Sequence, residues 1–206
     1  MTDQSVNKKA LDTKEKILIA ARNIFGQKGF YETKMDDIAR EAGIAKGTLY
    51  LYFKSKEELY ECLIKMGLNL IEQAILEILE APKSFSEKLK EIIAYIIDIL
   101  SDNREFVLRI MYEMPLAQIW KEDFKQKIFG EGQRLAESFR KFVIEGINVG
   151  FFSEYDPDIL TNVLIGAITR PVFVYFLEKK DMERLKIDLF EVIKNAFCKP
   201  CKGGSL

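Results

Sequence analysis

Apolar and polar residues alternate along this chain with the period of an α-helix. Apolar side chains recur every three or four positions, and no segment keeps the two-residue alternation of a half-buried strand. Helices are expected in the first 80 residues at about 13–28, 34–42, 46–53 and 56–80. Helix-ending signals separate them: Gly29 and Gly43 favour the left-handed backbone that closes a helix. Ser55 and Glu58 have the spacing of a capping box that opens the last of these helices.

Beyond Pro82 the expected helices are longer and more apolar, at about residues 86–100, 104–114, 122–152, 156–180 and 182–197. Asp156 is the expected cap of the penultimate helix, with Pro157 at its first position. The apolar run from Ile159 to Leu177 is long enough to span a bilayer, but it contains polar residues, an arginine and a proline. We therefore interpret it as a buried helix of a bundle, with no membrane partner.

The sequence thus predicts an all-α fold with two parts. Residues 1–57 form a small three-helix module that begins with a flexible arm at 1–11, and residues 58–206 form a larger helical bundle. Within the first part, two short helices joined by a turn with glycine are typical of a helix-turn-helix. Thr33 is the expected N-cap of the first of these two helices.

Charge and residue usage narrow the function. The formal net charge is only −1, but residues 1–60 hold eleven Lys and Arg against nine Asp and Glu, so the helix-turn-helix part is the basic one. The absence of histidine removes the commonest general base and metal ligand, and no phosphate-binding glycine motif is present. We expect no enzyme, no metal and no cofactor. The polar N-terminus and three scattered cysteines favour the cytoplasm.

The helix expected at residues 46–53 has two different faces. At about 100° per residue, Leu49 and Phe53 share the face that packs inward. Gly47 and Leu51 fall on the opposite face, with Thr48 beside them. A helix in the major groove needs such an outward face: glycine lets the backbone approach, and the threonine methyl can contact a thymine methyl.

Polar groups around this helix fit a DNA groove. Tyr50 and Tyr52 lie on its two flanks, where phenol hydroxyls can donate to phosphates. Lys46 stands at its start, where recognition helices meet bases. Lys56 opens the next helix, whose N-terminus favours a phosphate.

The segment "ILIAARNIFGQKGFYETKMDDIAREAGIAKGTLYLYFKSKEELY" resembles the N-terminal domain of the TetR/AcrR family of bacterial transcriptional regulators. Its core meets the pattern G-[IV]-[AS]-x-G-x-[LI]-Y-x-[YH]-F-x-[SN]-K-E-x-L at every position. The resemblance implies a dimeric helical repressor whose first domain binds a double-stranded operator and whose bundle binds a small effector. By position, it implies DNA contacts at Thr33, Lys34, Lys46, Gly47, Thr48, Tyr50, Tyr52 and Lys56. Ala45 replaces a common serine or threonine, which puts a hydroxyl contact there in question.

The dimer is expected to form through the last two helices, as an intermolecular four-helix bundle. The apolar run around Gly166 is too continuous for the surface of a monomer. Expected interface residues are Gly166, Val172 and Phe190.

Aromatic residues and methionines concentrate between residues 106 and 142, where Pro115 interrupts the helical pattern. Such side chains adapt to apolar ligands, so we expect a pocket for an elongated, mostly apolar effector of drug or fatty-acyl size. The candidate ligand-binding residues are Phe106, Arg109, Glu113, Trp120, Phe124, Phe139, Phe142, Asn148 and Arg170.

Some readings stay open at this stage. The chain could instead be a DNA-binding adaptor that engages a protein partner. Arg170, the sole charge between Ile159 and Leu177, could form an ion pair within the bundle or across the dimer, or it could anchor an acidic effector. Cys198 and Cys201 form a CxxC pair that suits a redox switch, half of a zinc site or a loose tail. Lys8 and Lys9 of the arm could reach a minor groove.

Overall fold

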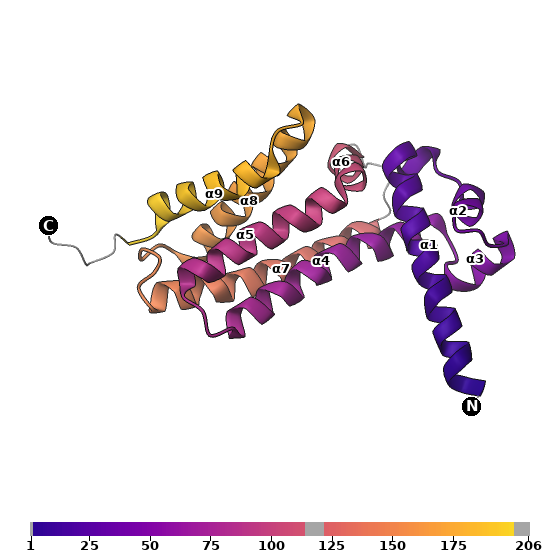
Figure 1. Ribbon diagram of the computed structural model, residues 1–206, viewed down its shortest axis with the longest axis horizontal. Helices are drawn as coiled ribbons and strands as arrows, with labels where there is room; N and C mark the ends of the chain where they lie inside the picture. The colour runs from indigo at the N-terminus through magenta and orange to yellow at the C-terminus, as the bar shows by residue number, and fades with distance from the viewer. Residues whose placement is uncertain (1, 114–121, 200–206) are drawn as a thin grey trace, which may run out of the picture. The chain divides into compact units, whose positions relative to one another are not determined.

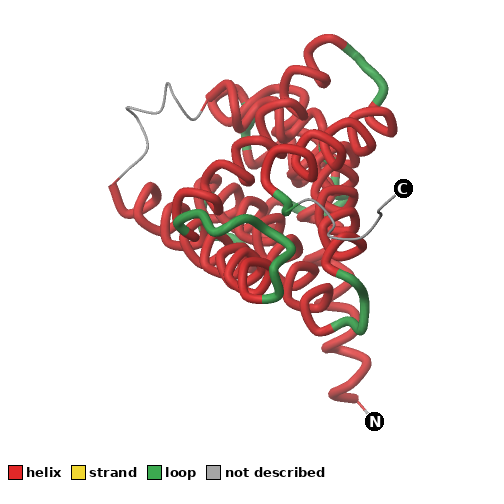
Figure 2. The backbone as a smooth tube through the Cα atoms, turned by 90° about the vertical axis from the view of Figure 1, so that its left-hand side faces the viewer, coloured by secondary structure: helices red, strands yellow, loops and turns green. Residues whose placement is uncertain are grey.

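In the computed structural model the backbone is described for residues 2–113 and 122–199, and side chains for residues 12–113 and 126–199 (Figure 1). Every named element in these ranges is an α-helix, as the all-α prediction requires (Figure 2). The helices are α1 (Thr2–Glu32), α2 (Met35–Glu41), α3 (Lys46–Tyr52), α4 (Lys56–Glu80), α5 (Phe85–Asp102), α6 (Arg104–Glu113), α7 (Glu122–Asn148), α8 (Pro157–Glu178) and α9 (Met182–Phe197).

The chain divides into two compact units, and they do not follow the predicted split at residue 57. The first unit comprises residues 1–66 and 103–128, and the second comprises residues 67–102 and 129–206. Helix α6 belongs to the first unit because it packs along α1. Helix α4 begins in the first unit and ends in the second.

An aromatic cluster forms the core of the first unit. The Tyr60 ring lies 4.8 Å from Phe25, 5.0 Å from Phe30 and 5.4 Å from Phe106, measured between ring centroids. These rings come from α1, α4 and α6, so the cluster joins helices that are distant in sequence. Burial raises the pKa of the Tyr60 phenol above its ordinary value.

Helix α1 differs from the prediction at both ends. It begins at Thr2, so the predicted loose arm at 1–11 is wrong for residues 2–11, which continue the helix. The physical reason is that no glycine or proline precedes Gly26, and nothing stops the helix. Gly29 has the expected positive φ of 79°, but its ψ of 172° is extended rather than left-handed helical.

The second unit packs α5, α8 and α9 together, with α7 supplying aromatic side chains. Phe142 lies 5.3 Å from Phe85 and 5.8 Å from Phe152 between ring centroids. The predicted cap of α8 is confirmed, because a carboxylate oxygen of Asp156 accepts from the N–H groups of Asp158 and Ile159.

Helix α8 is long and apolar enough to cross a membrane by length and composition, the one helix of this kind in the described ranges. This is weak evidence, because a core helix of a water-soluble protein passes the same test. One face of α8 is buried through Leu160, Leu164 and Ile168, whereas Ile159 and Val163 are exposed. The sequence predicts a buried helix, but α8 has one buried face and one exposed face.

Candidate nucleic-acid interface

The two faces of α3 lie as the sequence predicts. Leu49 is fully buried and Phe53 is 3% exposed, so both pack into the first unit. Leu51 is 84% exposed on the opposite face. The amphipathic pattern therefore determines which side of α3 faces solvent.

The turn before α3 is set by Gly43. This residue has a φ of 65°, which side-chain-bearing residues rarely adopt. The turn is closed by a hydrogen bond from the Ile44 N–H to the Ala39 carbonyl, at 3.0 Å. It brings α2 and α3 side by side as a helix-turn-helix (Figure 1).

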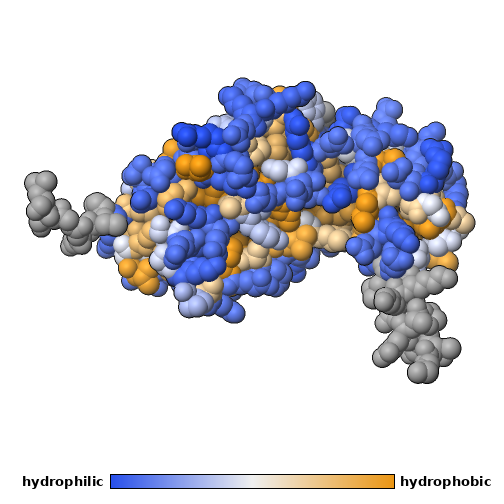
Figure 3. All heavy atoms as spheres, in the orientation of Figure 1, coloured by the Kyte–Doolittle hydropathy of each residue, from blue (hydrophilic) through white to orange (hydrophobic). Residues whose placement is uncertain are grey.

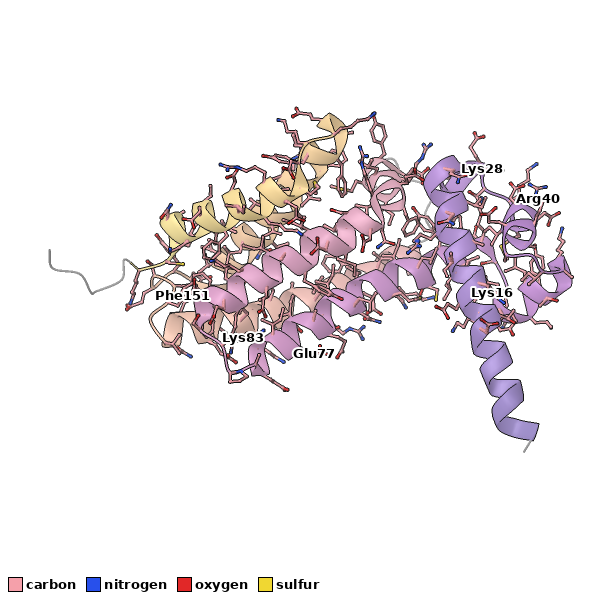
Figure 4. All side chains as sticks on the ribbon, in the orientation of Figure 1. Lys16, Lys28, Arg40, Glu77, Lys83 and Phe151 are labelled. Atoms are coloured by element: carbon pink, nitrogen blue, oxygen red, sulfur yellow. The ribbon has the colours of Figure 1, made fainter. Side chains whose placement is uncertain are left out.

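Helix α2 is tied to its neighbours by Asp37. Its carboxylate accepts from Lys28 of α1 at 2.7 Å and from Arg40 at 2.6 Å (both lysine and arginine are labelled in Figure 4). The hydrogen bond from Lys28 contributes most to lowering the Asp37 pKa, with further lowering from the positive charges of Lys28 and Arg40. The Lys28 pair holds α2 against α1, and both pairs neutralise an acidic charge next to the expected DNA surface.

Gly47 is not required by the packing of the protein. A Cβ atom placed there would have no atom within 4 Å, other than its own helix backbone and chain neighbours. The bare backbone instead leaves room on the outward face of α3. This is the arrangement expected where another molecule's surface comes close.

Lys46 stands at the start of α3 and pairs with Asp36 of α2, at 2.7 Å between Nζ and the carboxylate oxygen. The hydrogen bond that Lys46 donates to the Asp36 carboxylate raises the pKa of Lys46. Both side chains are more than half exposed, so water and salt screen this pair. Acceptors of a DNA base or phosphate can therefore replace Asp36.

The other predicted contacts on this surface are accessible. Lys34 is exposed at the N-cap of α2, and Tyr50 is 43% exposed. Thr48 and Tyr52 are half-buried. Together with Lys46 and Gly47 they make up what we call the α3 face.

Thr33 does not take the role that the sequence predicts. Its side chain is 1% exposed, and its hydroxyl donates to the Gly29 carbonyl at 2.6 Å. Lys34, not Thr33, occupies the N-cap of α2. The predicted DNA contact and the predicted cap are therefore both wrong for this side chain, because its hydroxyl instead caps the broken end of α1.

Lys56 also does not take the role that the sequence predicts. Its ammonium nitrogen donates to the carbonyls of Phe30 at 2.6 Å, Thr33 at 2.9 Å and Tyr31 at 3.3 Å. It also lies 4.5 Å from the centroid of the Phe30 ring, and burial lowers its pKa. The predicted phosphate contact is wrong for this conformation, since the ammonium already donates to three carbonyls next to the end of α1.

Two residues on this surface were missing from the predicted site. Leu51 was placed on the outward face by helical periodicity but was not counted as a contact, although its position opposite Leu49 was a usable signal. Asp36, the partner of Lys46, was not among the predicted contacts. Its pairing depends on how α2 and α3 cross, which local sequence does not specify.

The predicted effector residues are not brought together. Phe106 packs in the aromatic core of the first unit. Arg109 donates to the Gly26 carbonyl at 3.2 Å and to the Gln27 carbonyl at 2.9 Å. Both side chains therefore make contacts between α6 and the rest of the first unit, and their assignment to an effector pocket is wrong.

Glu113 is used in the same way. Its carboxylate accepts from the Phe30 N–H at 3.0 and 3.1 Å. It therefore holds the chain just after Gly29, where α1 breaks, and is likewise not available to a ligand.

The remaining effector candidates divide into three groups. Phe139 and Phe142 are buried in the core of the second unit. Asn148 and Arg170 are exposed, and the Arg170 guanidinium lies 5.6 Å from the Phe173 ring centroid. The expectation of a buried charge at Arg170 is therefore wrong, because the residue falls on the exposed face of α8. The whole of Trp120 and the side chain of Phe124 lie outside the described residues, as does Cys201.

Two of the three predicted interface residues are internal. Val172 is 1% exposed and Phe190 is 4% exposed within their own unit, so they cannot form the surface of a dimer. Gly166 is exposed, with open space around it. We define the α8/α9 face by the exposed residues of these helices, which include Ile159, Val163, Gly166, Ile187 and Val192.

Comparison with known protein families supports the helix-turn-helix reading. Residues 17–63 match the family described as bacterial regulatory proteins, tetR family. The fatty acid metabolism regulator protein of Bacillus subtilis (strain 168) is 24% identical over 180 residues, which cover 86% of this chain and 91% of that protein. The biofilm operon icaADBC negative transcriptional regulator IcaR of Staphylococcus aureus is 28% identical over 128 residues, covering 62% of this chain and 66% of IcaR.

Solved structures agree over most of the length. The fatty acid degradation regulator FadR from Bacillus halodurans has a TM-score of 0.77 at 22% identity, covering 89% of this chain and 98% of that one. FadR from Bacillus subtilis, solved in complex with stearoyl-CoA, has a TM-score of 0.74 at 26% identity. The match covers 87% of this chain and 97% of FadR. The helix order described above is therefore that of known regulators.

Proposed function

The chain belongs to the TetR family of transcriptional regulators, and on that premise we propose that it represses transcription by binding a palindromic operator as a homodimer. We further propose that it leaves the DNA when its helical bundle binds a small, mostly apolar effector. The α3 face is the part that reads the operator, through Lys34, Lys46, Gly47, Thr48, Tyr50 and Tyr52.

The observation that carries the DNA-binding proposal is the unused outward side of α3. Leu49 anchors the helix from one side, while the opposite side has bare backbone at Gly47, and Lys46 is an exposed cation at the helix start. A helix built in this way can enter the major groove with its backbone close to the bases. Tyr50 is 43% exposed, so its hydroxyl can then donate to a phosphate.

The effector proposal rests on the relatives. FadR from Bacillus subtilis was solved with stearoyl-CoA, and this chain spans nearly all of that protein. We propose a long-chain acyl thioester as the class of effector.

Release from DNA follows from linkage. A dimer that binds two half-sites must hold its recognition helices roughly 34–36 Å apart, one turn of DNA. An effector that binds better to dimers with another spacing shifts the population toward them. By reciprocity, the operator weakens effector binding by the same factor, typically about 5- to 150-fold.

The DNA half of the proposal is tested by selecting a binding site from random duplex DNA with the full chain. Fluorescence anisotropy then gives the dissociation constant for Gly47→Ala. The added methyl group fits the free protein and favours the helix by up to about 1 kcal/mol, so we expect a folded protein that binds the operator at least about tenfold more weakly. Gly67→Ala is the matched control, because Gly67 also has open space but lies in α4. Equal affinity of both variants would contradict the assignment of α3.

The effector half is tested with stearoyl-CoA, and with coenzyme A alone as control. We expect stearoyl-CoA to raise the melting temperature, since it binds the folded state, and to release the protein from its operator. Coenzyme A alone should do neither. A protein that binds operator DNA and ignores acyl chains of every length would favour the adaptor that engages a protein partner.

A further inference from the structure

We propose that Leu51 reads the 5-methyl group of a thymine in each operator half-site. This inference rests on the proposed DNA-binding function and adds a specificity-determining residue that neither the sequence pattern nor the comparisons assign. It concerns one side chain and one methyl group, so it can be tested atom by atom.

Leu51 is the most exposed large hydrophobic residue in the described part of the chain, at 84%. The packing of α3 does not need it, because Leu49 and Phe53 already fill the inward side. A polar residue at this position would keep the helix and improve solubility. An exposed leucine at the centre of this surface therefore points to a contact made outside the protein.

No neighbouring side chain of α3 covers Leu51 on the outward face of the helix. At about 100° per residue, Gly47 lies one turn before it on the same side of the helix, and nothing fills the space above that glycine. Tyr50 and Tyr52 diverge to the two flanks. Helix α3 has seven residues and is about 10 Å long, so Leu51 lies within reach of the base edges when the helix enters a groove about 12 Å wide.

The groups that base pairs present in the major groove indicate what Leu51 contacts. A leucine side chain cannot hydrogen-bond, and the thymine methyl is the apolar group that base pairs present in the major groove. The surroundings disfavour an apolar protein partner, because Lys34, Lys46 and Lys54 are exposed on the same module. Those cations suit the phosphates on both sides of a groove.

The experiment replaces single thymines of the selected operator with deoxyuridine, which removes the methyl and keeps the base pair. Burying one methyl is worth about a fourfold change in affinity. For the wild-type chain we expect about a fourfold loss at one thymine position per half-site. For Leu51→Ala we expect no loss at that position, because the leucine that contacts the methyl is gone.

Thr48 supplies the matched control, since its own methyl is the other candidate for such a contact. Thr48→Ser removes that methyl and should leave the uracil effect of Leu51 unchanged. If the loss persists in Leu51→Ala and disappears in Thr48→Ser, Thr48 makes the contact and the inference is overturned. It is also overturned if no thymine position responds. A wild-type chain that selects no DNA at all would instead refute the proposed function.

Discussion

At the scale of single residues, Lys56 stabilises the end of α1, where the helix breaks, by hydrogen bonds to its backbone. The backbone departs from helical geometry at Gly29, close to the carbonyl groups of Phe30 and Thr33 at the end of α1. Lys56 reaches them from the start of α4. Its charge therefore serves the positioning of α1 and α4, and not the binding of phosphate.

This assignment predicts opposite outcomes for two neighbouring lysines. Lys56→Met keeps most of the side-chain length but loses the hydrogen bonds, so we expect the free energy of unfolding to fall by about 1–3 kcal/mol. The dependence of operator affinity on salt should stay the same. Lys54 is exposed, and Lys54→Ala should leave stability unchanged and reduce the slope of log K against log salt by about 0.9 if it contacts one phosphate.

Urea denaturation and anisotropy titrations at several salt concentrations separate the two effects. A reduced salt slope with unchanged stability for Lys56→Met would restore the phosphate contact that the sequence suggested.

The contrast between Leu49 and Lys56 explains what the sequence could predict at this scale. The burial of Leu49 follows from helical periodicity, which is local and strong. The carbonyls that bind Lys56 lie where α1 breaks and its end folds next to α4. A lysine at a helix start looks the same in sequence whether its partner is a phosphate or a carbonyl.

At the scale of elements, the contact between α1 and α6 organises the first unit. Glu113 of α6 accepts from the Phe30 N–H, and Arg109 of the same helix donates to carbonyls of α1. Gly29 makes room for this contact. A Cβ added at Gly29 would lie far too close to the Glu113 carboxylate, and the positive φ already disfavours a side chain.

We therefore expect Gly29→Ala to destabilise the chain by about 1–3 kcal/mol. Glu113→Ala should also destabilise it, because the Phe30 N–H loses its carboxylate acceptor. The double variant should lose less than the two single losses combined, since removing the carboxylate relieves the clash. Thermal and urea unfolding of the four proteins measure this cycle. Strict additivity would show that only backbone strain matters at Gly29.

Element boundaries were predictable where capping residues mark them. Helix α8 begins at Pro157 after the Asp156 cap, and α4 begins at Lys56 after Ser55, which accepts the Glu58 N–H at 3.2 Å. The start of α1 was missed because no breaker precedes it. The membership of α6 in the first unit was also missed, because it depends on packing between residues about 80 positions apart.

At the scale of the whole molecule, we expect the α8/α9 face to bind a partner. Ile159 is 65% exposed, Ile187 is 58% exposed and Val192 is 60% exposed. The space-filling view shows a mostly hydrophilic surface interrupted by apolar strips (Figure 3). Large apolar side chains exposed on two helices that pack together are candidates for an interface in a soluble protein. A second copy of the same helices is the partner that a symmetric regulator supplies.

Val163 tests this assembly more cleanly than the residues first expected from the sequence. Unlike Val172, Val163 is 42% exposed, so a charge there leaves the core of the unit intact. In a two-fold interface each substitution occurs on both subunits, and Val163→Glu should bury charge without a partner. We expect sedimentation and light scattering at micromolar concentration to report a folded monomer. Operator affinity should fall sharply, because one half-site is then bound at a time.

Leu70→Glu is the control for this variant, since Leu70 is 51% exposed but lies on α4. It should remain a dimer with unchanged operator affinity. A Val163→Glu protein that stays dimeric, or a wild-type chain that is monomeric at these concentrations, would place the interface elsewhere or remove it. Loss of dimer with operator affinity retained would show that one α3 face suffices, and the palindrome would then no longer be required by the protein's symmetry.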